Sequence, residues 1–121
     1  MMAEYAEALK RNGIDYDGAM ERFGGNAELY ERLALKFLDD THFAALEQAL
    51  AGGDVDTAVR EAHTLKGVAG NLSFAALYEA ASKANAALRE GDLAGATALM
   101  DPVRSAHAAV VSALGSLRDA R

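Results

Sequence analysis

Residues 54–72 read Asp54-Val-Asp-Thr-Ala-Val-Arg-Glu-Ala-His63-Thr-Leu-Lys-Gly-Val-Ala-Gly-Asn-Leu72. Apolar residues recur in this stretch every three or four positions, which predicts one long amphipathic helix with a core-facing stripe. The residues of that stripe are Val55, Ala58, Ala62, Leu65, Ala69 and Leu72. Asp54 is a suitable N-cap after the helix-stopping pair Gly52-Gly53. His63 follows Ala62 by about 100° around a helix of ~3.6 residues per turn, so we expect its ring to face solvent.

The surroundings of His63 are unusual for a helix surface. Arg60, Gly67 and Gly70 share one stripe with it, and two of these three residues have no side chain. A glycine inside a helix costs about 1 kcal/mol relative to alanine, so two glycines beside an imidazole favour access to the ring over helix stability. Lys66, three residues after His63, can approach a negative group attached to that ring. An accessible histidine beside a lysine is suited to carrying a phosphoryl group reversibly.

The rest of the chain also predicts helices. We expect short helices over residues 3–11 and 15–23, a longer helical segment over 26–50 with a bend at 39–41, and helices over 54–72 and 73–91. A last helical region begins at residue 92 and breaks at Asp101-Pro102. The expected N-caps are Asp15, Asn26, Asp54, Ser73 and Asp92. Short connections favour antiparallel neighbours. The predicted fold is all-α: an antiparallel four-helix bundle with one or two short N-terminal helices, in a single domain of residues 1–121.

Composition excludes several kinds of function. The chain has no cysteine, which excludes thiol nucleophiles, disulfides and zinc–thiolate sites. Its net charge of −6 argues against a nucleic-acid partner. No apolar run reaches the ~18 residues of a membrane span, and residues 1–12 lack the apolar core of a signal peptide, so we expect a cytoplasmic protein. The three histidines are far apart in sequence and no phosphate-binding glycine loop is present, so neither a metal site nor an ATP site is expected.

The motif around His63 resembles the phosphoacceptor signature of histidine-containing phosphotransfer (HPt) domains. The resemblance rests on His63-Thr-Leu-Lys-Gly67 with Asn71-Leu72 and covers roughly residues 13–117. Its other parts are Gly13-Ile-Asp-Tyr-Asp-Gly-Ala-Met20, Phe23-Gly-Gly-Asn26, Phe37-Leu-Asp-Asp40, Ala51-Gly-Gly-Asp54, Leu77 and Arg89-Glu-Gly-Asp92. Two residues depart from the family pattern. Ser73 stands where glycine is usual, and Asn85 where glutamate is frequent, and both bear on local packing and partner choice.

The resemblance implies a phosphorelay intermediate of bacterial two-component signalling. Nε2 of His63 would accept a phosphoryl group from a receiver-domain aspartate and pass it to a second receiver, and Lys66 would stabilise the phosphate. Arg60, Gly67, Gly70 and Asn71 would contribute to partner docking. The chain would be a monomeric carrier and not an enzyme, with no cofactor of its own, because the Mg²⁺ would belong to the receiver. A hybrid histidine kinase is a further candidate partner.

Two other interpretations stay open at the level of sequence. The chain could be a helical docking module without chemistry, or the phosphoacceptor domain of a larger hybrid or chemotaxis kinase. The charged helix end at Arg121, with no linker after it, favours a stand-alone protein. Of the remaining histidines, we expect His42 to be a boundary residue without a role and His107 to be a partly buried packing residue. Glu61 is expected to be a solvated charge.

Overall fold

The computed structural model describes the backbone of residues 2–120 and the side chains of residues 4–120. Every regular element in this part of the chain is a helix, as the composition predicts. The elements are η1 (Met2–Tyr5), α1 (Ala6–Arg11), α2 (Tyr16–Arg22), α3 (Ala27–Lys36), η2 (Phe37–Asp39), α4 (His42–Ala51), α5 (Val55–Asn71), α6 (Ala75–Arg89), α7 (Leu93–Ala98) and α8 (Met100–Asp119).

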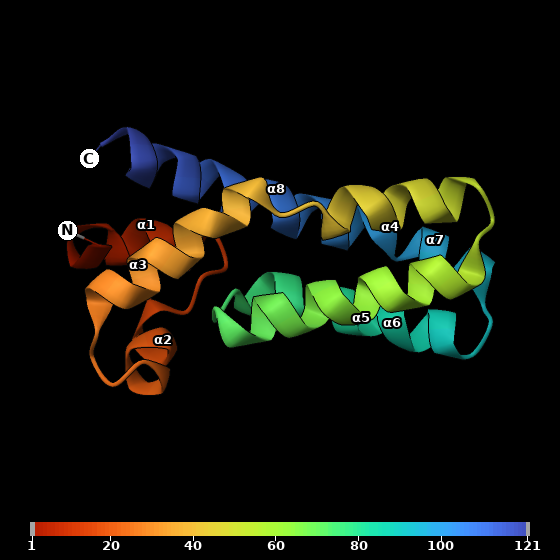
Figure 1. The fold of residues 1–121 in the computed structure, drawn as a ribbon, viewed down its shortest axis with the longest axis horizontal. Coiled ribbons are helices and arrows are strands. Elements are labelled where there is room, and N and C mark those ends of the chain that lie inside the picture. The colour runs from red at the N-terminus through yellow and green to blue at the C-terminus, as the bar shows by residue number, and fades with distance from the viewer. Residues whose placement is uncertain (1, 121) are drawn as a thin grey trace.

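Four long segments form an antiparallel bundle, which confirms the predicted fold class (Figure 1). The helices α3 and α4 form one rod that bends at η2, where the sequence predicted a restart at residues 39–41. The helix α5 packs against α4 and α6, and α6 packs in turn against α7 and α8. The helices α1 and α2 gather with α3 at one end of the bundle, beside the C-terminal half of α8. The long helix α5 therefore has helical neighbours on part of its surface and solvent on the rest.

Aspartate and asparagine begin four of the helices as the sequence predicted. Each side chain accepts a hydrogen bond from the backbone N–H three residues later, which satisfies a donor that the helix itself leaves without an acceptor. The pairs are Asp15 with Gly18 at 3.0 Å, Asn26 with Leu29 at 3.0 Å, Asp54 with Thr57 at 3.2 Å and Asp92 with Gly95 at 2.8 Å.

The predicted N-cap at Ser73 is wrong, because Ser73 ends α5 instead of starting α6. Its φ of 57° lies in the left-handed region, and its N–H donates to the Gly70 carbonyl at 3.3 Å. The N–H of the next residue, Phe74, donates to the Ala69 carbonyl at 2.9 Å. Phe74 is the N-cap residue of α6. These two bonds form the left-handed helix ending in which glycine is usual. The departure from the family pattern therefore falls on a backbone position that favours glycine.

The predicted break at Asp101-Pro102 is also displaced. The chain breaks at Leu99, between α7 and α8. Asp101 and Pro102 both lie within the first turn of α8. A proline is tolerated there because backbone N–H groups of the first turn have no intrahelical acceptor. Pro102 does lie at the beginning of a helix, but Asp101 and Pro102 are the second and third residues of α8, and the predicted break at these two residues is wrong.

The core is apolar, and it includes most of the predicted stripe of α5. Ala58, Ala62, Leu65, Ala69 and Leu72 are buried, whereas Val55 at the start of the helix is half-buried. The largest buried side chain is Tyr30 of α3, whose hydroxyl donates to the Leu72 carbonyl at 2.5 Å. Two backbone bonds lie nearby, from the Asp15 N–H to the Ser73 carbonyl at 2.8 Å and from the Ala76 N–H to the Gly13 carbonyl at 3.2 Å. The N-terminal helices are thus attached to the turn that joins α5 to α6.

Candidate functional site

His63 occupies the centre of α5 and is exposed, as the sequence predicted. The buried stripe on the opposite side of the same helix fixes its orientation, because Ala62 and Leu65 are fully buried. The start of α5 is held by Asp54, whose carboxyl has a lowered pKa because hydrogen bonds from Thr57 favour its charged form. The imidazole therefore stands on a well-anchored helix with its ring toward solvent.

The two glycines after His63 have different surroundings. A Cβ atom placed on Gly67 would meet no atom within 4 Å, so the space beside His63 at this turn is open. A Cβ atom on Gly70 would stand 3.0 Å from Cδ1 and 3.1 Å from Cε1 of Tyr78, a residue of α6. Gly67 therefore leaves the surface accessible, whereas the space at Gly70 is used by an aromatic ring of the neighbouring helix.

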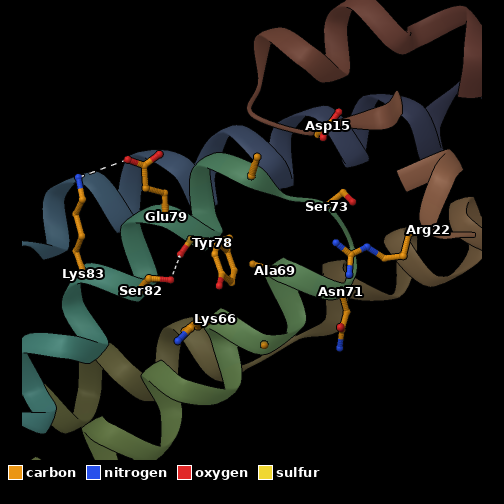
Figure 2. A pocket seen from close by; sticks show the side chains of 13 residues that line it. Asp15, Arg22, Lys66, Ala69, Asn71, Ser73, Tyr78, Glu79, Ser82 and Lys83 are labelled. Atoms are coloured by element: carbon orange, nitrogen blue, oxygen red, sulfur yellow. Dashed lines mark hydrogen bonds and ion pairs between the residues drawn. The ribbon is translucent and has the colours of Figure 1, made fainter. Parts of the chain in front are cut away.

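Four of the predicted site residues line one open groove of about 950 Å³ between α5 and α6 (Figure 2). We call it the α5–α6 groove. The residues that α5 contributes include Lys66, Gly67, Gly70 and Asn71, of which Lys66 is half-buried and Asn71 exposed. His63 and Arg60 are outside its lining, on the turns of α5 that precede it. Arg60 is exposed, and its guanidinium donates to the Thr57 hydroxyl at 3.1 Å.

The groove also contains residues that sequence reasoning missed. Tyr78 points from α6 toward α5, and the Arg22 side chain extends from the end of α2 toward the part of the groove lined by Asn71 (Figure 2). A signal for Tyr78 existed in the sequence. Gly70 and Tyr78 each lie four residues from Phe74, so an antiparallel hairpin folded about that residue brings them opposite one another. No comparable signal existed for Arg22, because its position depends on how the N-terminal helices pack.

Asn85 connects α6 to the turn of α5 that precedes His63. Its side chain is 2% exposed, and its amide donates to the Val59 carbonyl at 3.3 Å. In an α-helix the carbonyl of residue 59 is the acceptor for the N–H of residue 63. The departure from glutamate at this position therefore produces a neutral, buried contact behind the histidine and does not change the exposed face.

The other two histidines pack between helices. Nδ1 of His42, in α4, lies 2.7 Å from a carboxylate oxygen of Glu61 in α5, so the expectation that Glu61 is a solvated charge is wrong. No local pattern predicts this pair, because the two residues are 19 positions apart. His107 is half-buried and stacks on Phe43 with ring centroids 4.3 Å apart, which confirms its packing role. Burial lowers the pKa of His107, with Asp40 and Glu47 partly opposing the change.

Two further findings describe the surface of the molecule. Within residues 2–120 no helix combines the length and apolarity that a membrane span needs. The described side chains also include no group of three or more histidine, aspartate or glutamate residues placed to hold a metal ion. The chemistry that the exposed face of α5 offers is a nucleophilic imidazole with a lysine one turn away and unobstructed space at Gly67.

Comparison with known protein families gives one match. A family model described as "Hpt domain" matches residues 37–120, a segment that begins at η2 and includes α4 to α8. Comparison with curated proteins and with solved structures gives no match. The matched segment contains His63, Lys66 and Tyr78, whereas Asp15 and Arg22 precede it.

Proposed function

Since the chain belongs to the Hpt domain family, whose members carry phosphoryl groups in phosphorelays and interact with receiver domains, we propose that His63 is its phosphoacceptor. The observation that supports this assignment is the exposure of His63 at the centre of α5, with open space at Gly67 on the next turn. His42 and His107 are both half-buried, and each contacts side chains of other elements. His63 therefore offers a partner the most accessible imidazole.

The proposed transfer is a displacement at phosphorus. Nε2 of a neutral imidazole forms the N–P bond, the P–O bond to the receiver aspartate breaks, and the aspartate leaves as a carboxylate. The reverse reaction on a second receiver returns His63 to its starting state. Phosphoryl transfer needs mainly positioning and charge stabilisation, and the receiver would supply the Mg²⁺ for the transferring group. The chain is accordingly a carrier with no kinase activity of its own, as Hpt domains are.

The neighbours of His63 have separate roles in this proposal. Lys66 favours the phosphorylated state electrostatically, because a phosphoryl group on nitrogen brings about two negative charges near its ammonium group. Gly67 allows the receiver to approach the ring. Arg60, Gly70 and Asn71 belong to the docking face around it. We further propose that the chain acts as a monomer in the cytoplasm of a bacterium, between a hybrid kinase or receiver that donates and a receiver that accepts.

The test is phosphorylation of the full chain and of its His63→Gln variant. Labelled phosphoramidate serves as a small-molecule donor, and a panel of receiver domains loaded with labelled acetyl phosphate serves as the protein donors. We expect the wild type to acquire acid-labile label from both sources and His63→Gln to acquire none, with an unchanged circular-dichroism melt because the replaced ring is exposed. His42→Gln and His107→Gln are matched controls that should retain the label. Retention of label by His63→Gln, with its loss from one of the two controls, would refute the assignment.

A further inference from the structure

We propose that Tyr78 is the docking anchor of the α5–α6 groove for the receiver domain that exchanges the phosphoryl group with His63. The receiver surface that contacts Tyr78 is apolar and is flanked by carboxylates. This inference rests on the proposed function and adds to it the residue that determines how tightly the receiver binds. The evidence is the exposure of Tyr78, its support by Gly70, the charges of the groove and the position of the groove relative to His63.

Tyr78 is the exception to the burial of large apolar side chains in this protein. Among residues 4–120 it is the large hydrophobic residue that remains exposed, with 41% of its surface accessible. Isolated exposed apolar residues are common on protein surfaces and need no explanation by themselves. Tyr78, however, lies in a groove that also contains Lys66 and Gly67, one turn from the proposed phosphoacceptor. Tyrosine is enriched among the few residues that provide most of the binding energy of protein interfaces.

The ring of Tyr78 is supported by the α5 backbone. The close distances between its ring and a Cβ atom on Gly70 show that any larger residue at position 70 would displace it. A glycine within a helix destabilises that helix relative to alanine, so the contact is formed at the expense of α5 stability. A ring that already packs against a neighbouring helix has less conformational entropy to lose when a partner binds, which favours affinity.

The charges of the groove indicate an acidic partner surface. Glu79 forms an ion pair with Lys83 at 3.5 Å, and the Asp15 carboxylate caps α2. The two other charged residues of the groove, Arg22 and Lys66, have no ion-pair partner within the part of the chain that the structure describes. Free cations at this place contrast with the net charge of −6 of the whole chain. Carboxylates on the receiver surface that meets the groove would be complementary to them, whereas a second copy of this chain docked through the same groove would bring two more cations.

The geometry allows one partner to contact Tyr78 and His63 together. Gly70, which supports the ring, follows His63 by seven residues, or roughly 10 Å along a helix that rises ~1.5 Å per residue. A standard protein interface covers about 800 Å² on each partner, a patch roughly 30 Å across. The intervening turn carries Gly67, where no atom obstructs the approach.

The experiment measures phosphoryl transfer to the full chain from the receiver that labels the wild type fastest, loaded with acetyl phosphate. We expect Tyr78→Ala to raise the KM for the phosphorylated receiver roughly tenfold or more with little change in kcat, as loss of a binding anchor does. Tyr78→Phe keeps the ring and should stay within about twofold of the wild type. Gly70→Ala should raise KM a few-fold, because the ring must move away from the new methyl group. Direct labelling of His63 by phosphoramidate should be unchanged in all three variants.

The cations are tested with a matched pair of arginines. Arg22→Ala should weaken receiver binding and reduce its dependence on salt, because a contact with a partner carboxylate is lost. Arg32→Ala removes another exposed arginine, from α3 and outside the groove, and should have no effect.

Three outcomes would overturn the inference. If Tyr78→Ala has the same KM as the wild type, and the wild type accepts the phosphoryl group normally, this inference would be overturned and the proposed function would stand. A dimer in sedimentation that Tyr78→Ala dissociates would show that the occupant is a second copy of the chain. Failure of every receiver to label the wild type would overturn the proposed function and this inference with it.

Discussion

Replacing Tyr30 with phenylalanine tests how the N-terminal helices are attached to the histidine-bearing helix. The Tyr30 side chain is fully buried, and its hydroxyl donates to the carbonyl of Leu72, the C-cap residue of α5. Phenylalanine keeps the ring and its edge contacts with Tyr16 and Phe23 but leaves that carbonyl without its donor. Loss of one partner of a buried hydrogen bond costs about 1–3 kcal/mol, so we expect a free energy of unfolding about 2 kcal/mol lower than that of the wild type.

Urea denaturation measures this change directly. With a slope of ~2 kcal/mol per molar urea, the midpoint should fall by about 1 M without a change of slope. The melting temperature should fall by roughly 6–10 °C for a domain of this size. Tyr78→Phe is the matched control: it removes the hydroxyl from a tyrosine that is 41% exposed and should change the free energy of unfolding by less than about 0.5 kcal/mol. Phosphoramidate labelling of His63 should persist in both variants under native conditions.

The pH dependence of the same variant gives an independent check. Burial raises the pKa of Tyr30 well above its ordinary value, and the nearby charges of Asp15 and Tyr16 act in the same direction. The unfolded chain therefore loses this proton near pH ~10 while the folded chain retains it, so the contribution of Tyr30 to stability declines as the pH rises above about 10. The difference in stability between wild type and Tyr30→Phe should narrow there. A destabilisation below about 0.5 kcal/mol at pH 7, or a difference that stays constant above pH 10, would refute the reasoning.

Three further predictions concern the site and its surroundings. Gly67→Leu should raise thermal stability slightly, because leucine is the better helix former and meets no neighbour. The same variant should slow transfer from a receiver, and unchanged transfer kinetics would contradict the role of open space at this turn. Lys66→Ala should lower phosphohistidine stability or transfer rate a few-fold, since a solvated charge pair contributes roughly 0.2–1 kcal/mol, whereas Lys66→Arg should keep most of the stabilisation that lysine provides. Wild-type behaviour of both variants at low salt would exclude the electrostatic role. Because burial lowers the pKa of His107, the folded state resists its protonation and stability should fall as the pH drops below about 6.5; acid denaturation curves of His107→Phe should show a smaller loss, and identical curves would contradict the prediction.

Local signals in the sequence were sufficient to predict most of the fold. The caps at Asp15, Asn26, Asp54 and Asp92 depend on a side chain and a backbone N–H three residues apart, so they could be read directly. The orientation of His63 followed in the same way from the spacing of the buried stripe on α5. The error at Ser73 has a physical reason. Serine is a common N-cap, and nothing local reveals that α5 must end through a left-handed residue at that position.

The candidate site was predictable only as far as one helix extends. Lys66 and Gly67 share α5 with His63, and their register follows from helix geometry. The contact of Tyr78 with Gly70 and the approach of Arg22 to the groove depend on the packing of α6 and α2 against α5. The bond between His42 and Glu61 likewise joins two helices. Such contacts depend on interhelical distances, which periodicity within a single helix does not determine.

The hydrogen bonds from the N-terminal segment to the α5–α6 turn lie partly outside the segment that the family model matches. The segment shared with the Hpt family begins at residue 37, but Tyr30, Asp15 and Gly13 precede it and bond to the turn at residues 72–76. A chain cut at residue 37 would keep the whole segment that the family model matches yet lose these three hydrogen bonds. The hydrogen-bonded contacts of the α5–α6 turn therefore extend upstream of the matched segment. An exchange of phosphotransfer modules between signalling proteins that follows the family boundary would leave part of the folded protein behind.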